Sequence, residues 1–208
     1  MSSIEGMFTC VTKKGKGKGY GDYVVTFTRL EAIMTAVEAS ERIARVRRTG
    51  VPDGRRDFNH GSLFIDAIGM AGERAMMKML PPGAVSVRVG EGEMPSRRRL
   101  TDKGDIVCGD LCFEVKTTIR TGKCMHLIIP SGFFAEEEIA THTVLYARAA
   151  TTFCLVIVDR TEDDPHPVRA ICNSTFTAAG YISLDEAVKY PARSDGSIWI
   201  QESRLEKF

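Results

Sequence analysis

Two carboxylates and an amine stand at regular spacing in the stretch GDIVCGDLCFEVKTT, residues 104–118. Gly109 and Asp110 separate two apolar runs there, which predicts a β-hairpin whose two-residue turn has glycine first, as a type II′ turn prefers. The turn sets the register of the strands, and four pairs follow from it: Cys108–Leu111, Val107–Cys112, Ile106–Phe113 and Asp105–Glu114. The last pair is of the non-hydrogen-bonded kind, in which the two Cα atoms lie only about 4.5 Å apart.

Alternation along the strands predicts one apolar and one charged face for this hairpin. Asp105, Glu114 and Lys116 share the charged face, and the apolar face carries Ile106, Cys108, Leu111, Phe113 and Val115. Like charges opposite each other destabilise a sheet, so a divalent cation between Asp105 and Glu114 would offset their repulsion. Two carboxylates suit Mg²⁺, which keeps positions for water and a phosphate oxygen. Lys116 could then orient or deprotonate an attacking water and stabilise the charge that develops on phosphorus.

This pattern resembles the PD-(D/E)xK nuclease superfamily, the restriction-endonuclease-like proteins, in which an Asp and an E-x-K sequence follow a helix that bears a Glu. Asp105 matches the Asp, Glu114 and Lys116 match E-x-K, and Glu73 in GMAGERAMMKML matches the helix Glu. Gly104 stands where proline is frequent in that family. The order G-x-x-G-E, D…E-x-K, HLIIP, LVIVD, GYISLDEA is similar to small phage and prophage members, which often end in a segment matched here at residues 180–187.

The resemblance implies an α/β (α+β) fold with a restriction-endonuclease-like α-β-β-β-α-β core, a mixed central sheet flanked by helices, and an extra N-terminal helix. It implies a phage- or mobile-element-encoded, Mg²⁺-dependent DNA endonuclease that hydrolyses phosphodiester bonds, with Mn²⁺ as a substitute ion. The catalytic residues would be Lys116, Glu114, Asp105 and Glu73, and the three carboxylates would also hold the metal. His126, on the strand after E-x-K, and Thr117 are candidate accessory residues.

Other interpretations of these residues stay open at this point. Glu114 and Lys116 could form a surface pair on a solvated strand, and Glu73 could be an exposed helix carboxylate. His126 could be a strand histidine with a hydrogen-bonded partner. The alternative function is a catalytically silent DNA-binding or assembly protein on the same fold, because a fold does not determine a function.

The elements that must position these residues follow from hydrophobic periodicity and from end signals. Thr28 and Glu31 form a capping box before the first helix, and Pro81-Pro82 ends the second. We expect helices over 28–48, 62–80, 133–150 and 183–190, and strands over 85–89, 105–108, 111–116, 125–129, 153–159, 168–172 and 197–201. Residues 1–27 would be a basic arm and lead-in, and residues 28–208 one domain with its core at about 62–160 and a C-terminal extension over 161–208.

Charge is divided unevenly along the 208 residues, although the net charge is only +1. Residues 1–104 carry 18 Lys and Arg against 12 Asp and Glu, whereas residues 105–208 carry 10 against 15. A basic half favours a polyanionic partner such as DNA. The candidate DNA contacts are Arg97, Arg98, Arg99, Lys13, Lys14, Arg47, Arg48, Arg55 and Arg56. A disordered tail is the alternative for Lys13 and Lys14, and a solvated loop is the alternative for the three arginines at 97–99.

Several classes of protein are disfavoured by the sequence. It has no apolar run of 18 residues and no apolar core after its first charges, so we expect neither a membrane span nor a signal peptide. Six cysteines without framework spacing predict reduced thiols and a cytoplasmic protein, in the bacterial host if phage-encoded. Cleavage of both DNA strands with one site per chain would favour a homodimer.

Overall fold

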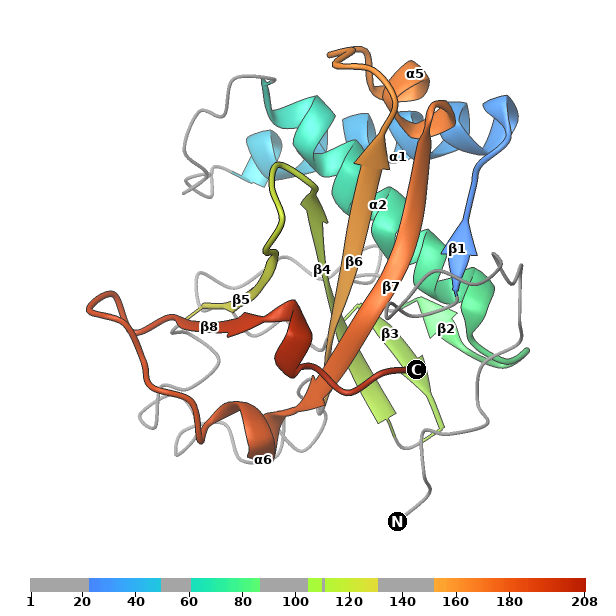
Figure 1. The fold of residues 1–208 in the computed structure, drawn as a ribbon. Coiled ribbons are helices and arrows are strands. Elements are labelled where there is room, and N and C mark those ends of the chain that lie inside the picture. Colours follow the sequence, from blue (N-terminus) through green and yellow to red (C-terminus); the bar gives the residue numbers. More distant parts are fainter. Residues whose placement is uncertain (1–22, 50–60, 87–104, 110, 131–151) are drawn as a thin grey trace.

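The computed structural model describes residues 23–49, 61–86, 105–109, 111–130 and 152–208. These residues form a mixed α/β structure with a six-stranded sheet in the order β1-β7-β6-β4-β3-β2 and a separate two-stranded sheet, β5-β8 (Figure 1). The strands are β1 (Val24–Val25), β2 (Val85–Ser86), β3 (Ile106–Cys108), β4 (Leu111–Ile119), β5 (His126–Ile129), β6 (Thr152–Arg160), β7 (Ser174–Ser183) and β8 (Ile198–Gln201). The helices are α1 (Arg29–Thr49), α2 (Gly61–Met79), α5 (Pro167–Cys172), α6 (Leu184–Ala187) and the 3₁₀ turn η2 (Glu202–Arg204).

Helix α1 begins with the predicted capping box. The backbone N–H of Thr28 donates to the Glu31 carboxylate at 2.8 Å, and the Glu31 N–H donates to the Thr28 hydroxyl at 3.3 Å. Two of the N–H groups that a helix start leaves without partners are thereby satisfied. The prediction of this helix and of its start is confirmed.

Helix α2 is tied to α1 by polar contacts along one side. Arg74 pairs with Glu38 at 2.8 Å and donates to the Thr35 hydroxyl at 2.6 Å, and Lys78 pairs with Glu31 at 2.6 Å. The α2 residue next to Arg74 is Glu73. These contacts hold the middle of α2, and therefore the backbone of Glu73, in a set place against α1.

Strand β6 is buried on both sides, as its unbroken apolar sequence predicts. Cys154, Val156 and Val158 belong to the cluster that includes α1, α2 and α5, while Phe153, Leu155 and Ile157 belong to the cluster beneath β5 and β8. The six-stranded sheet therefore has a helix-covered face and a face covered by the small sheet. Figure 1 shows α2 running behind β4, β6 and β7, with β8 in front of the sheet.

The predicted hairpin register is confirmed over three pairs. Cys108 pairs with Leu111, Val107 with Cys112 and Ile106 with Phe113. Gly109 has a φ of +60°, the positive value that a tight hairpin turn requires at this position. On its other edge β4 runs parallel to β6, and Glu114 and Lys116 share a face with Phe153 and Leu155 of β6. The two site residues of β4 thus project from the face that the small sheet covers.

The prediction of a strand over 168–172 is wrong, because this segment is helix α5. Pro167 occupies its first turn, where a missing N–H does no harm. Asp164, two residues before the N-cap His166, accepts the His166 N–H at 2.8 Å and pairs with Arg169 of the helix at 2.6 Å. The sequence analysis also missed β7, which pairs with β6 along its length although its sequence, STFTAAGYIS, is not strongly apolar.

The other elements differ from expectation mainly in length. The last predicted strand is β8, and the predicted helix at 183–190 is the shorter α6, whose N-cap Ser183 accepts the Glu186 N–H at 3.2 Å. The predicted helix over 133–150 lies outside the described residues, and so do residues 1–22 of the arm and lead-in predicted over 1–27. Within that predicted lead-in, Val24–Val25 form β1 and pair with β7. No helix in the described part of the chain is long and apolar enough to span a membrane. The five cysteines that the structure describes are free thiols, as predicted.

Candidate functional site

Asp105 lies immediately before β3, at the end of the hairpin ladder. Its N–H donates to the Phe113 carbonyl at 2.7 Å, and its carboxylate Oδ2 accepts the Val115 N–H at 2.7 Å. The carboxylate thus takes the place of the carbonyl that a longer β3 would present to β4. The predicted fourth strand pair, Asp105–Glu114, is not part of the ladder, because β3 begins only at Ile106.

The carboxyl of Asp105 has a pKa raised to about 7. Loss of solvent is the largest cause, and the negative charge of Glu73 is the second. The hydrogen bond from Val115 and the charges of Lys116 and Arg42 act in the opposite direction and only partly compensate. Asp105 therefore carries its negative charge at a cost in the folded protein.

Glu73 on α2 is the carboxylate that Asp105 senses most strongly. Its side chain is 22% exposed and lies 3.7 Å from the guanidinium of Arg42, which is 49% exposed. Glu73 is thus a partly buried residue facing the start of β3, not a fully solvated helix carboxylate. Sequence reasoning missed Arg42, because nothing in a single helix shows which residue of a second helix it will meet.

Glu114 is buried, with 6% of its surface exposed, and its carboxylate contacts the ammonium of Lys116 two residues along β4. The Lys116 side chain is 29% exposed, and its charge reaches Asp105. The interpretation of Glu114 and Lys116 as a pair on a solvated strand face therefore does not hold for Glu114. We name four residues together the acidic site: Glu73, Asp105, Glu114 and Lys116.

The negative charge of this site also raises the pKa of two neighbouring thiols. Burial raises the pKa of Cys112 to about 11, and the charges of Glu114 and Asp105 contribute to that rise. Burial, and after it the charge of Asp105, also raises the pKa of Cys154 on β6. The field of Asp105 thus extends across β4 to the centre of the main sheet.

Thr117 lies on the helix-covered face of β4, opposite to Lys116. Its hydroxyl donates to the Gly69 carbonyl of α2 at 3.4 Å. A Cβ added to Gly72 of the same helix would lie 1.9 Å from that hydroxyl oxygen. Thr117 therefore sets the spacing between helix and strand, and its accessory role in chemistry stays a prediction.

His126 opens β5 on the outer face of the small sheet, whose inner face packs Leu127 and Ile129 beneath it. The imidazole lies 5.8 Å from the ring of Trp199, measured between centroids. The structure thus places His126 beside an indole and not among the carboxylates.

The predicted cationic DNA contacts fall where side chains are not described. Arg47 and Arg48 belong to α1, but the structure describes only their backbone. The other predicted contacts lie outside the described residues: Lys13, Lys14, Arg55, Arg56, Arg97, Arg98 and Arg99. Their role in DNA binding stays a prediction.

Within the described residues, no group of three or more His, Cys, Asp or Glu side chains converges as a ready metal cage. The three predicted metal ligands, Glu73, Asp105 and Glu114, therefore do not come together as one group in this structure. Mg²⁺ is commonly held by only one or two carboxylates and keeps its remaining positions for waters and phosphate oxygens. The donor set of the acidic site is of this sparse kind.

No family model, curated protein or solved structure matches this chain.

Proposed function

We propose that this chain is a metal-dependent DNA endonuclease that hydrolyses phosphodiester bonds on a restriction-endonuclease-like fold. The observation that carries the proposal is the partly buried carboxyl of Asp105, whose pKa burial and the charge of Glu73 raise to about 7, with Lys116 close enough to counteract that shift. Two carboxylates that repel each other beside a lysine suit a site that recruits a cation and a phosphate.

The order of the elements supports this proposal. Helix α2 precedes β2, β3 and β4, which pair antiparallel one after the other, and β6 then lies parallel to β4. This arrangement agrees with the helix, three strands and returning strand that the family pattern implies. The carboxylates come from α2, from the start of β3 and from β4, as that pattern also implies.

Asp105 and Glu73 are the residues we expect to hold the metal, whereas Glu114 projects from the face that the small sheet covers. A divalent ion there would supply Lewis-acid stabilisation of phosphate charge and a more acidic bound water. The raised pKa of Asp105 favours this ion, since a cation would relieve the repulsion that Glu73 exerts on Asp105.

Lys116 is the residue we expect to act on the attacking water and on the phosphate. Its contact with Glu114 holds the ammonium on one face of β4, and 29% exposure leaves the side chain open to a ligand. A positioned ammonium can orient a water and stabilise negative charge that increases in the transition state.

A second candidate is a catalytically silent DNA-binding or assembly protein on the same fold. The ion pairs favour it, because Glu114 contacts Lys116 and Glu73 lies near Arg42 without any added cation. In the silent protein, Lys116 and Arg42 would neutralise the carboxylates of the acidic site completely. In the endonuclease, a divalent cation would still be needed to neutralise them.

Supercoiled plasmid DNA with Mg²⁺ or Mn²⁺ separates these functions, and EDTA is the control. We expect nicked and linear products from the native chain, none with EDTA, and a strong loss of cleavage in Glu73→Gln. Glu186→Gln is the matched control, because Glu186 is an exposed carboxylate on α6. Plasmid binding without cleavage under every metal condition would favour the silent protein.

Cleavage of both strands by a chain with one acidic site would require two copies, so we include a homodimer on DNA in this proposal. Sedimentation of the protein with and without a short duplex, in EDTA, measures the stoichiometry. One copy per duplex together with linear plasmid products would exclude the dimer.

A further inference from the structure

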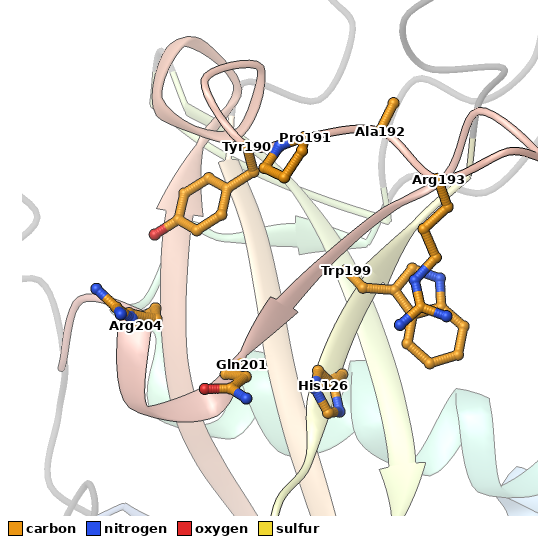
Figure 2. Close-up of a pocket in the computed structure, with 8 residues that line it drawn as sticks. All are labelled: His126, Tyr190, Pro191, Ala192, Arg193, Trp199, Gln201 and Arg204. Atoms are coloured by element: carbon orange, nitrogen blue, oxygen red, sulfur yellow. The ribbon is translucent and has the colours of Figure 1, made fainter.

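An open hollow lies on the outer face of the small sheet. Its volume is about 580 Å³, and its lining residues are His126, Tyr190, Pro191, Ala192, Arg193, Trp199, Gln201 and Arg204. We name this feature the outer hollow. Figure 2 shows Tyr190 on one side of it, Trp199 with Arg193 on the other, and Gln201 and His126 along the strands between them.

The indole of Trp199 is held in place by a short chain of hydrogen bonds. Its Nε1–H donates to the Ser197 hydroxyl at 2.9 Å, and that hydroxyl donates to Asp195 at 2.6 Å. A tight turn supports this chain: the Gly196 N–H donates to the Arg193 carbonyl at 2.8 Å, and Gly196 has a φ of +77°. The ring is thus oriented before any ligand arrives, although 37% of Trp199 is exposed.

Positive charge flanks the outer hollow at both ends. The guanidinium carbon of Arg193 lies 3.6 Å from the centre of the Trp199 ring, and Arg204 lies beside Tyr190 in Figure 2. None of the eight lining residues is acidic. The nearby carboxylate of Asp195 already accepts both the N–H and the hydroxyl of Ser197.

Aromatic faces between two arginines match one class of ligand. Bases stack on aromatic rings and on guanidinium planes, and arginines bind the phosphates on either side. Gln201 and His126 add hydrogen-bonding groups suited to base edges. A duplex hides its base faces, and a purely acidic peptide such as polyglutamate has no rings to place on Trp199.

We infer that the outer hollow binds a single-stranded segment of nucleic acid, with a base against the Trp199–Arg193 stack and the backbone running toward Arg204. It lies on the side of the main sheet from which Glu114 and Lys116 project. This inference goes beyond the proposed cleavage and does not depend on it, since no residue of the acidic site takes part.

Trp199 is the only tryptophan in the chain, so its fluorescence reports on this surface alone. The experiment titrates the full chain, in EDTA, with 12-nucleotide oligo(dT) and oligo(rU), each against a 12-base-pair duplex and polyglutamate. We expect saturable quenching by at least one of the two single strands. Equal quenching by duplex or by polyglutamate would overturn the inference.

Arg193→Ala and Arg204→Ala test the two phosphate contacts, and Arg29→Ala, an exposed arginine that opens α1 on the helix-covered side, is the matched control. Labelled oligo(dT) anisotropy should show each hollow variant binding about fivefold more weakly at 0.1 M salt, with a log–log salt slope lower by about 0.7. Trp199→Leu should lose at least about fivefold, because base stacking is removed. Unchanged affinity in all three variants would refute the inference.

The failure of this inference and the failure of the proposed cleavage give different results. Lys116→Ala should keep full quenching by oligo(dT), because Lys116 lies outside the outer hollow. A chain that binds oligo(dT) through Arg193 and Arg204 but cleaves no DNA would support the hollow and refute the nuclease. A chain that cleaves DNA but gives no quenching would do the reverse.

Discussion

The acidic site and the outer hollow carry charge in opposite ways. Asp105 and Glu73 lie partly buried between α2 and the hairpin, and burial together with their mutual repulsion raises the pKa of Asp105 to about 7. Arg193 and Arg204 stand in solvent on the outer surface. Buried charge loses hydration and interacts strongly with neighbours, whereas exposed charge keeps its hydration and is screened by salt.

This difference predicts how each region responds to its surroundings. The acidic site should respond to pH and to divalent cations, because either a proton or an ion relieves its repulsion. The outer hollow should respond to ionic strength, because its arginines gain by releasing counterions from a strand. Changes at the acidic site should therefore be measured as changes in the stability of the fold. Changes at the outer hollow should be measured as changes in the affinity for a nucleic-acid strand.

The largest expected effect tests whether the two regions belong to one folding unit. Phe113 is fully buried on the helix-covered side of β4, and Phe113→Ala should lower the free energy of unfolding by about 3–5 kcal/mol. Chemical unfolding followed by Trp199 fluorescence and by circular dichroism should give one transition at a lower midpoint. Two separate transitions would show that the outer hollow folds apart from the acidic site.

The second largest expected effect is a loss of DNA cleavage in a variant that still folds. Lys116→Ala should reduce metal-dependent plasmid cleavage by at least about a hundredfold, since a positioned acid–base or electrostatic group contributes on this scale. Its unfolding midpoint should fall, because buried Glu114 loses its contact with the Lys116 ammonium, but circular dichroism in the absence of denaturant should match that of the native chain. Undiminished cleavage would remove Lys116 from the mechanism.

A third prediction concerns the electrostatic cost at Asp105. The folded-state pKa of about 7 exceeds the ordinary value of 3.8, so the folded chain holds this proton more tightly than the unfolded chain. The group therefore destabilises the fold above pH 7, and this penalty disappears as the pH falls toward 4. Asp105→Asn removes the charge and keeps an acceptor for the Val115 N–H, so it should stabilise the chain at pH 8, by a few kcal/mol at about 1.4 kcal/mol per pKa unit.

Thermal melts of Asp105→Asn and of the native chain at pH 8 and pH 4.5 measure this difference. The gain should be largest at pH 8 and small at pH 4.5. Mn²⁺ should raise the melting temperature of the native chain but not of the variant, because only a charged site binds the ion. Asp185→Asn, at an exposed position on α6, is the control and should change neither. A variant that is less stable at pH 8 would contradict the prediction.

The smallest effect extends the comparison to residues outside the described structure. Replacing Arg97, Arg98 and Arg99 by alanine should lower the log–log salt slope of duplex DNA binding by about 0.9 for each phosphate that the variant no longer neutralises. Metal binding at the acidic site should be unaffected. An unchanged slope would assign these arginines to a solvated loop and move the search to Lys13, Lys14, Arg55 and Arg56.

The features predicted correctly from sequence are those set by neighbours in the chain. The hairpin register follows from the turn at Gly109, and the start of α1 follows from Thr28 and Glu31 three residues apart. The error over 168–172 is also local: β-branched residues suggested a strand, whereas Pro167 and Asp164 signal a helix start. In all three segments, residues close together in the chain determine the structure. The prediction failed only at 168–172, where the signals of a helix start were overlooked.

The features that could not be predicted depend on packing between distant segments. The approach of Glu73 to Asp105 was expected only from the family resemblance, because it requires α2 to lie against the start of β3 and no spacing in the sequence sets that distance. The outer hollow joins His126, Arg193 and Trp199 only because β5 pairs with β8. Sequence reasoning named His126 a candidate accessory residue of the acidic site because it follows E-x-K, but chain proximity does not determine which sheet a residue joins.

The position of Glu73 in the acidic site depends on an uncharged contact, the close approach of Gly72 to Thr117. A methyl group there would lie 1.9 Å from the Thr117 hydroxyl oxygen and 2.9 Å from the Thr117 Cβ, so rotating the threonine could not make room. Helix α2 would have to move outward, and Glu73, the next residue, would move with it. The pKa of Asp105 thus depends on a steric contact. Because Gly72 carries a hydrogen atom in place of a methyl group, α2 lies close enough to β4 for Glu73 to repel Asp105.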